Sequence, residues 1–584
     1  MRHVMAMAIT WYGNQSEAEG CRFGALAMLW PLLQRMQVAS IIDRHLPVDP
    51  QAEFSHGKVL SLLIAARLFS PVALVNVGGW AAESGADILW DMPVEKINDD
   101  RLGRAVDAFF DQRHSILAAL ALHVSHEFDT PLEEIHYDPT HLLFHGVYEA
   151  SEARGALQTD AGEVRSDGRL APAHITAGRP MSDAPKDVQL IHAGLCTIVD
   201  EWGPLPIFGH TVSGNDNGHT AVAEQLALLR KHLRPPELTM ISDRGTFSLG
   251  HLLRLEDAGY HAIAAAPWDE FRGLFDKQRP ALKWKKATYL SIEQQRRRGP
   301  SSLPREHYEL AVVRHELTEA GSGRTLPCRV IFVFSTADQK VARKNRDKSV
   351  AKLRAGLEQI ARSVEDGRRY TDPTAIARRV GKLFGQRQAA EYFRYEMLPL
   401  SKKEREQLPP PQRGCRRPDH RFQFTFDQAA SDRDAAYDGY SAMVATTPWE
   451  QSADLVFTKY KQQGFSELAN HEFKSPLAVH PLFLKSPRRV EALVFLMMIS
   501  LTAYFLLQRM YRKSLPANAS PKERRTTTQT LLRAFSNYTL ILHHTRIGRV
   551  VQPTRLTTRQ REILGRLGFD TPAQILSRQL PRAP

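Results

Sequence analysis

The most apolar stretch of the chain covers residues 492–507 and reads ALVFLMMISLTAYFLL. As an α-helix it would span about 24 Å, which is short of the roughly 30 Å hydrocarbon core of a bilayer. Arginines flank it, and Ser500, Thr502 and Tyr504 lie within it. The stretch therefore predicts a helix buried inside a large domain, and no membrane is expected as a partner.

The rest of the chain divides into regions with different predicted secondary structure. At 584 residues it is too long for a single hydrophobic core, so several domains are expected. Apolar residues recur at helical spacing near the start, for example in residues 57–69 and 114–128. Asp99 and Asp100 precede another such run and are predicted to cap it. The predicted regions are a helical one at 1–127, a strand-rich one at 128–264, an insertion with a returning strand at 265–450, a second part of the core at 451–515, and a helical one at 516–584.

Strand patterns dominate the second region. Residues 133–146 (EEIHYDPTHLLFHG) alternate and predict a strand, a turn and a strand. Residues 188–200 and 204–214 predict a hairpin, a helix is expected at about 219–232, and residues 238–243 (LTMISD) predict a further strand. Strands in a meander, followed by a helix and another strand, indicate an α/β fold with a mixed sheet covered by helices. The basic, Pro-rich residues 265–450 are interpreted as an insertion between two halves of this sheet domain.

The net positive charge of the chain is compatible with a polyanionic partner such as a nucleic acid. The net charge is +13, and each Lys or Arg that meets a phosphate releases a bound counterion. A protein that is merely basic is an equally good interpretation on charge alone. The four cysteines are scattered, form no C-x-x-C pair and suit a reducing cytoplasm.

Three acidic residues stand out by their context. Asp138 lies on a predicted strand just before the predicted turn. Asp243 ends an apolar strand and precedes Arg244-Gly245, so we expect its carboxylate at the carboxyl edge of the sheet, where α/β folds place their sites. Glu467 lies in a predicted helix over residues 460–474 (YKQQGFSELANHEFK).

The spacing within that helix predicts two faces. At about 100° per residue, one polar stripe carries Tyr460, Gln463, Glu467, His471 and Lys474. The opposite side carries Phe465, Leu468, Ala469 and Phe473, which are expected to pack against the sheet.

Such a set of acids suits phosphodiester chemistry. Two Mg²⁺ ions about 3.5–4 Å apart can activate water and stabilise both the attacking and the leaving oxygen. Mg²⁺ prefers carboxylate oxygens and usually takes only one or two from the protein, so three carboxylates can serve two ions. The opposing interpretation is structural, because a single Asp at a strand end is most often a cap and a single Glu on a helix is usually solvated. The ordered set of three is more specific than any one member.

The helix also resembles a known signature. Tyr460, Gln463, Glu467 and Lys474 have the spacing of the Y-x2-R-x3-E-x6-K motif of bacterial insertion-sequence transposases of the DDE type. The segments IHYDPTHLLFHG and MISDRG resemble that family's first and fourth strands, each with a catalytic aspartate. GHTVSGNDNGHTAV (209–222) and YDGYSAMVATT (437–447) resemble further family segments. The resemblance covers most of the chain.

The resemblance implies a fold, a reaction and partners. It implies a ribonuclease H-like core interrupted by a largely β insertion, with helical N- and C-terminal regions and DNA-end binding by the first of them. Asp138, Asp243 and Glu467 would hold Mg²⁺ (or Mn²⁺), two ions per site, and Tyr460, Gln463 and Lys474 would contact DNA. The expected partners are the element's terminal inverted repeats, target DNA and a second copy of the chain, in the bacterial cytoplasm. Metal-activated water would nick one strand, and the freed 3′-hydroxyl would then attack.

One residue departs from the motif, and two other functions stay open. Gln463 replaces the family's arginine, so a cationic contact to DNA is replaced by a neutral one. One alternative is a transposase-derived DNA-binding protein without catalysis, and the other is a metal-dependent nuclease without strand transfer.

Overall fold

The computed structural model describes most of the chain, with gaps. The residues described are 17–47, 50–144, 148, 158–159, 162–163, 171–177, 189–215, 222, 225–289, 307–367, 372–385, 387–408, 410–411, 415–474, 484–545 and 548–579.

The first region is helical, as predicted. Its longest helix, α6, is capped by Asn98, whose side chain accepts from the Arg101 backbone N–H at 2.9 Å. Asp99 and Asp100 were predicted to be the caps; they lie instead in the first turn of α6, where their charge favours the helix N-terminus. The helices are α1 (Leu26–Arg35), α2 (Val38–His45), α3 (His56–Phe69), α4 (Val77–Ser84), α5 (Ala86–Leu89) and α6 (Asp99–Glu127).

A mixed sheet of ten strands forms the centre of the molecule. Strand β2 pairs antiparallel with β6 and parallel with β8, β8 pairs parallel with β9, and β6 forms the predicted antiparallel hairpin with β7. The α/β class with a mixed sheet is therefore confirmed. The core strands are β2 (Glu134–Phe144), β6 (Gln189–Asp200), β7 (Gly203–Ser213), β8 (Thr239–Ser242) and β9 (His261–Ala266), with β5 (Thr176–Ala177) at the edge; β3 (Gln158–Thr159) and β4 (Gly162–Glu163) form a separate hairpin, and α8 (Leu249–Asp257) precedes β9.

The prediction of strand, turn and strand over residues 133–146 was wrong. Strand β2 runs without a break through Pro139, which pairs with Gly194 of β6. Its pairing with β8 ends at Tyr137, so Pro139 lies where β2 has only β6 beside it among the described strands. A proline, which has no N–H to donate, is tolerated at such an edge position.

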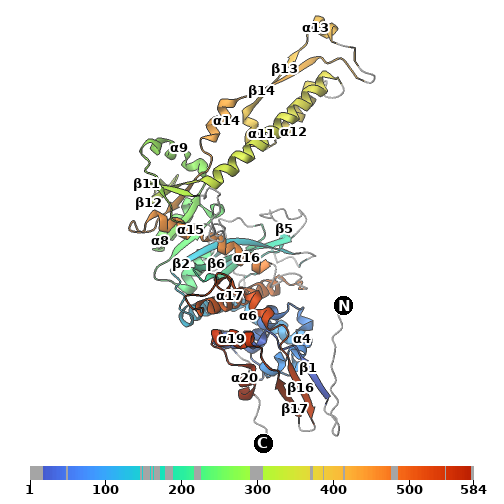
Figure 1. The fold of residues 1–584 in the computed structure, drawn as a ribbon, viewed down its shortest axis with the longest axis vertical. Coiled ribbons are helices and arrows are strands. Elements are labelled where there is room, and N and C mark those ends of the chain that lie inside the picture. Colours follow the sequence, from blue (N-terminus) through green and yellow to red (C-terminus); the bar gives the residue numbers. More distant parts are fainter. Residues whose placement is uncertain are drawn as a thin grey trace.

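The insertion at 265–450 divides into two parts, and the expectation that it is largely β was wrong. Strands β10 (Lys285–Lys286), β11 (Tyr308–Thr318), β12 (Thr325–Ser335) and β15 (Tyr440–Ala445) extend the central sheet beyond β9, next to α9 (Trp268–Gln278). The described residues between 336 and 438 instead form an arm that projects from this end of the sheet (Figure 1). The arm contains α11 (Thr336–Glu365), α12 (Pro373–Phe384), β13 (Phe393–Pro399), α13 (Lys402–Gln407), β14 (His420–Phe426) and α14 (Gln428–Ala435).

The sheet is covered on both faces. Alternate residues of β12 belong to two hydrophobic cores, with Ile331 and Val333 in one and Val330 and Phe332 in the other. Val456 and Phe457 of α15 (Ala453–Lys461) complete the smaller core. After a single turn residue, Gln462, α16 (Gln463–Lys474) packs on β2, β6 and β7, so the helix predicted over residues 460–474 is two helices.

The apolar stretch forms part of α17 (Pro487–Lys513), and the prediction of a buried helix is confirmed. The helix is long and apolar enough to cross a membrane, yet its most apolar window is wholly buried in the fold. It lies between the sheet and the N-terminal helices and packs on β7, α6 and α3 (Figure 1). Gly209 of β7 leaves room for both neighbours, since a Cβ there would lie 2.6 Å from the Gly194 carbonyl oxygen of β6 and 3.0 Å from the Met498 sulfur of α17.

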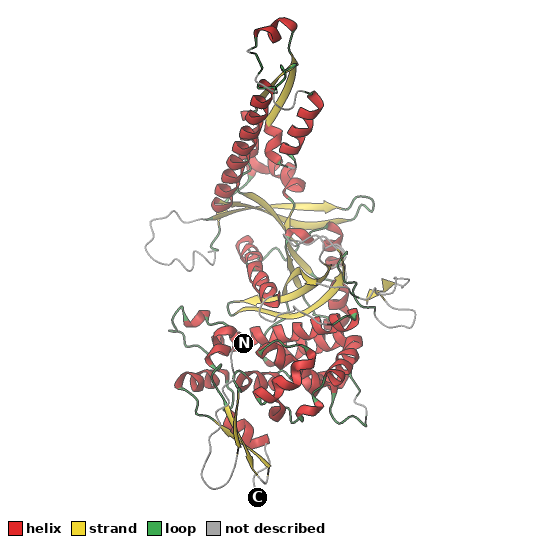
Figure 2. Ribbon diagram, turned by 90° about the vertical axis from the view of Figure 1, so that its right-hand side faces the viewer, coloured by secondary structure: helices red, strands yellow, loops and turns green. Residues whose placement is uncertain are grey.

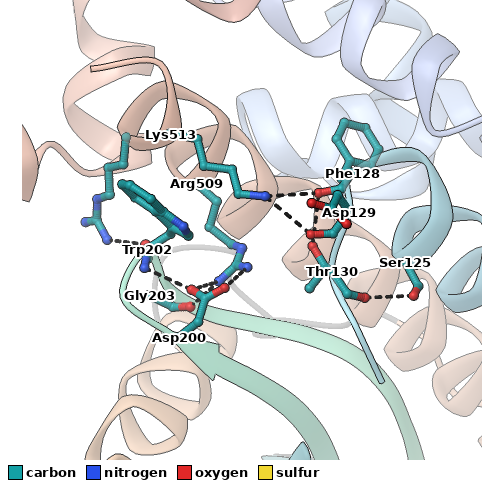
Figure 3. Close-up of polar contacts among 10 residues, drawn as sticks. Ser125, Phe128, Asp129, Thr130, Asp200, Trp202, Gly203, Arg509 and Lys513 are labelled. Atoms are coloured by element: carbon teal, nitrogen blue, oxygen red, sulfur yellow. Dashed lines mark hydrogen bonds and ion pairs between the residues drawn. The ribbon is translucent and has the colours of Figure 1, made fainter. Parts of the chain in front are cut away.

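Charged side chains of α17 tie three regions together. The Arg509 guanidinium donates to both carboxylate oxygens of Asp200, at 2.6 and 2.5 Å, at the end of β6 (Figure 3). Lys513 donates to the backbone carbonyls of Phe128 and Asp129, which link α6 to β2. Near the other end of α17, Glu491 accepts from Arg113 of α6 at 2.8 Å, and both side chains are almost fully buried.

The C-terminal region was predicted to be helical but also contains strands. Strand β1 pairs with β16, and β16 pairs with β17, so residues near both ends of the chain share one small sheet (Figure 1). Thr557 and Gln560 form a capping box at the start of α19. The elements are α18 (Thr528–Ala534), β16 (Leu540–Thr545), β17 (Gly548–Pro553), α19 (Thr558–Leu567) and α20 (Pro572–Gln579), with β1 at Glu17–Cys21.

We predict that Glu491→Ala destabilises the fold by about 3–5 kcal/mol, because it leaves the Arg113 charge buried without its partner. Chemical denaturation monitored by circular dichroism measures this. Asp570→Ala is the matched control: it removes an exposed partner of Arg578 and is expected to change the free energy of unfolding by less than about 1 kcal/mol. An equal loss in the free energy of unfolding for the two variants would show that the buried pair of Glu491 and Arg113 stabilises the fold no more than an exposed pair does.

Candidate active site

The two aspartates lie side by side at one edge of the sheet. Strands β2 and β8 are parallel neighbours, and their last paired residues are Tyr137 and Ser242. Asp138 and Asp243 each follow directly after that pair. Both carboxylates therefore start from the carboxyl ends of this parallel pairing, as predicted for a site in an α/β sheet.

Helix α16 brings Glu467 to this edge. Ala469 and Phe473 are fully buried against the sheet, as predicted, and Glu467 is exposed. Leu468 was expected to be buried, but 42% of it is exposed.

The buried stripe of α16 is instead Gln463, Ser466, Asn470 and Phe473, whose 3-4-3 spacing fits one helical face. Helix α16 is therefore rotated about its axis relative to the prediction, because polar groups of β2 form hydrogen bonds with its polar side chains.

The carboxyl group of Asp138 is affected by the charges of both other acids. Burial raises the pKa of Asp138 to about 6, and the negative charges of Asp243 and Glu467 act in the same direction. A hydrogen bond from Asn470 and the positive charge of Lys474 lower it, but by less. The site thus holds three carboxylates whose charges are not balanced by its nearby cation.

Tyr460 and Lys474 lie beside the same acids. Burial raises the pKa of Tyr460, and the charges of Asp243 and Glu467 raise it further. Burial lowers the pKa of Lys474, while Asp138 acts against that shift. The structure therefore brings these two side chains together with the three acids that the sequence singled out.

Gln463 is near the site but turned inward. Its Oε1 accepts from Nδ1 of His136 at 2.9 Å, and its Nε2 donates to the Tyr137 carbonyl at 3.3 Å. Burial lowers the pKa of His136 to about 4, so this imidazole is neutral at pH 7. Gln463 joins α16 to β2 directly before Asp138, and its expected contact with DNA stays a prediction.

Asn470 is a site residue that the sequence reasoning missed. Its Nδ2 donates to the Oδ2 of Asp138 at 2.8 Å, which fixes that carboxylate. It lies one heptad after Gln463 and three residues after Glu467, and this helical spacing is the signal that would have found it.

The acids fit a divalent cation in charge but do not form a closed cage. Among the described residues, no three His, Cys, Asp or Glu side chains are grouped so that they could hold a metal. Burial raises the pKa of Asp138, the charges of Asp243 and Glu467 add to that shift, and such a set of carboxylates favours a cation beside it. A closed cage is not required for Mg²⁺, because this ion usually takes only one or two protein carboxylates and completes its shell with water and phosphate oxygens.

Two other segments have different outcomes. The segment 437–447 contains strand β15, which returns from the insertion as predicted. The segment 209–222 begins in β7, and its residues 216–221 lie outside the described residues.

Comparison with known protein families gives a match in the first region. Residues 22–122 are similar to a family described as a domain of unknown function (DUF4277). That match covers α1 to α5 and most of α6, and includes none of the site residues. No curated protein matches the chain.

We predict that Gln463→Ala lowers the free energy of unfolding by about 1–3 kcal/mol, because the His136 ring and the Tyr137 carbonyl lose their partner while buried. Thermal and urea denaturation measure the change. Gln462→Ala, one residue earlier at the turn between α15 and α16, should leave stability nearly unchanged. A Gln463 variant as stable as the wild type would show that this contact does not hold α16 in place.

Proposed function

We propose that this protein is a DDE-type transposase that cuts DNA at the ends of an insertion sequence and transfers them to target DNA. The observation that carries the proposal is the placement of Asp138 and Asp243 directly after the last paired residues of two parallel strands, where burial and then the charges of Asp243 and Glu467 raise the pKa of Asp138. These acids come from two neighbouring strands and a helix that are far apart in the sequence.

The strand arrangement supports a ribonuclease H-like core. Counting the strands of four or more residues from β2, the chain forms three antiparallel strands and then two that run parallel to the first. Asp138 lies on the first of these strands and Asp243 directly follows the fourth. In the transposase family the two catalytic aspartates belong to the first and fourth strands of the core. In this chain Glu467 then follows on a helix after the insertion.

The residues of the site have distinct proposed roles. Asp138, Asp243 and Glu467 would hold two Mg²⁺ ions, with Mn²⁺ as a possible substitute. When bound, such ions lower the pKa of water and stabilise charge on the attacking and leaving oxygens. Asn470 orients Asp138, and Gln463 and His136 hold the helix against β2. Lys474 and Tyr460 would contact the DNA backbone beside the scissile phosphate.

The proposed partners are the element's terminal inverted repeats, target DNA and a second copy of the chain, in the bacterial cytoplasm. The net charge of +13 supports a DNA partner. Two ends must be brought together for transfer, which is the reason for expecting a dimer.

Two rival functions make different predictions. A DNA-binding protein without catalysis would bind a specific end and cut nothing in Mg²⁺ or Mn²⁺. A nuclease without strand transfer would digest DNA with no preference for ends. The clustered acids favour catalysis over the first rival.

We predict that Asp138→Ala, Asp243→Ala and Glu467→Ala each abolish cleavage of a duplex that carries the element's end, while binding to that duplex remains. Each loses a carboxylate from the cation site and no contact to the DNA backbone. Gel assays for nicking and fluorescence anisotropy for binding measure the two properties. Glu201→Ala, which removes an exposed carboxylate in the β6–β7 turn, should cut like the wild type. Full nicking by any of the three variants would remove that residue from the active set.

We also predict that Mn²⁺ raises the melting temperature of the wild type, because a ligand that binds only the folded state stabilises it by about 2.7 kcal/mol at 100 times its Kd. The Asp138→Asn/Asp243→Asn double variant should show no such rise. Without metal it should melt at or above the wild-type temperature, because mutual repulsion of the acids is gone. An equal Mn²⁺ response in both proteins would place the metal elsewhere.

A further inference from the structure

The arm carries a concentration of positive charge. The described residues of 336–438 include 20 Lys and Arg against 15 Asp and Glu. The arm has its own hydrophobic core, in which Leu353, Leu357 and Ile360 of α11 pack with residues of α12 and the β13–β14 hairpin. It projects away from the sheet and the helical regions (Figure 2), so this charge is presented on a separate body.

Four lysines of α11 form a regular row on its outer surface. Lys340, Lys344, Lys348 and Lys352 recur at every fourth residue, and all four are exposed. Each step advances about 6 Å along the helix and about 40° around it, so the row extends over about 18 Å. The core residues Leu353 and Leu357 lie on the other side of α11, which turns the lysine row away from the arm's core.

The lysine row is not explained by local stability. Within the described chain, none of its four side chains forms an ion pair, whereas the neighbouring Arg343 and Arg346 pair with Asp347 and Asp438. Like charges at every fourth residue destabilise a helix by about 0.2–0.5 kcal/mol per pair. An ordinary solvated face would mix charges of both signs, so an unbalanced row suits a polyanion that neutralises it.

The sheet register places the arm at the same edge as the candidate active site. Ser242, next to Asp243, pairs with Ala264, which pairs with Val444, which pairs with Val330 of β12. Strand β12 runs parallel to β8 and continues five residues past Val330 to Ser335, where α11 begins. With strands about 4.8 Å apart and about 3.3 Å per residue, α11 starts on the order of 20 Å from Ser242. One helical turn of a DNA duplex, about 34 Å, covers that distance.

We propose that the lysine row binds the phosphate backbone of double-stranded DNA roughly one helical turn away from the catalytic acids. This inference rests on the proposed function for where the DNA lies, but the contact itself requires no cleavage. The row is expected to bind duplexes of any sequence, because lysines that contact phosphates position a duplex without contacting its bases.

The test replaces the row by glutamine, as K340Q/K344Q/K348Q/K352Q, in the full chain. Binding to two unrelated 40-base-pair duplexes is measured by fluorescence anisotropy over a series of KCl concentrations without divalent metal. Each lost phosphate contact lowers the slope of log affinity against log salt by about 0.9, so a fall of about 3 to 4 is expected, equal for both sequences. At about 100 mM salt the affinity should fall by at least about tenfold.

Two controls separate charge from folding. The arginine row K340R/K344R/K348R/K352R keeps the charge and should bind like the wild type. The glutamine row should melt at or above the wild-type temperature, because it removes like-charge repulsion on an exposed face; if it unfolds, K344Q/K348Q is measured instead, with half the change in slope.

The outcomes separate this inference from the proposed function. A wild-type salt slope in the folded glutamine variant overturns the DNA contact of the row, even if the protein cuts element ends. A reduced slope in a protein that never cuts such ends supports the row and rejects the transposase.

Discussion

The buried helix α17 is the constraint on which the rest of the structure depends. Its apolar surface is covered by the N-terminal helices and by β7 of the sheet, so neither region can be removed without exposing it. Its buried charges then decide how those regions are joined. Glu491 requires Arg113 of α6, and Arg509 requires Asp200 at the end of β6, since a buried charge without a partner costs several kcal/mol.

The candidate active site follows from this arrangement. The hairpin of β6 and β7 is held on α17, and β2 pairs with β6, which places Asp138 beside the end of β8. Helix α16 packs across β2, β6 and β7, and its polar contacts with His136, the Tyr137 carbonyl and Asp138 set its rotation. The acids thus stay close together despite their repulsion because the surrounding packing fixes their strands and helix.

Sequence patterns were reliable where a local signal matched the final environment. The hairpin of β6 and β7, the strand before Asp243 and the buried helix were all predicted, because apolar periodicity reflects burial directly. Sequence patterns failed where residues far away in the sequence determined the local structure. Pro139 was predicted to lie in a turn, but a proline fits within strand β2 because the pairing with β8 ends before it. Leu468 was predicted to be buried, but it is exposed because the polar partners in β2 set the rotation of α16.

The sequence by itself determined which acids were candidates, the spacing of Gln463, Glu467 and Lys474 on one helix, the excess of positive charge and the burial of the apolar helix. Only the tertiary structure decided that the charges of Asp243 and Glu467 act on Asp138, that Gln463 turns inward, and that the insertion splits into sheet strands and a separate arm. The physical reason is that helical spacing and apolar patterning are set within a few residues, whereas strand pairing and charge proximity join residues hundreds of positions apart.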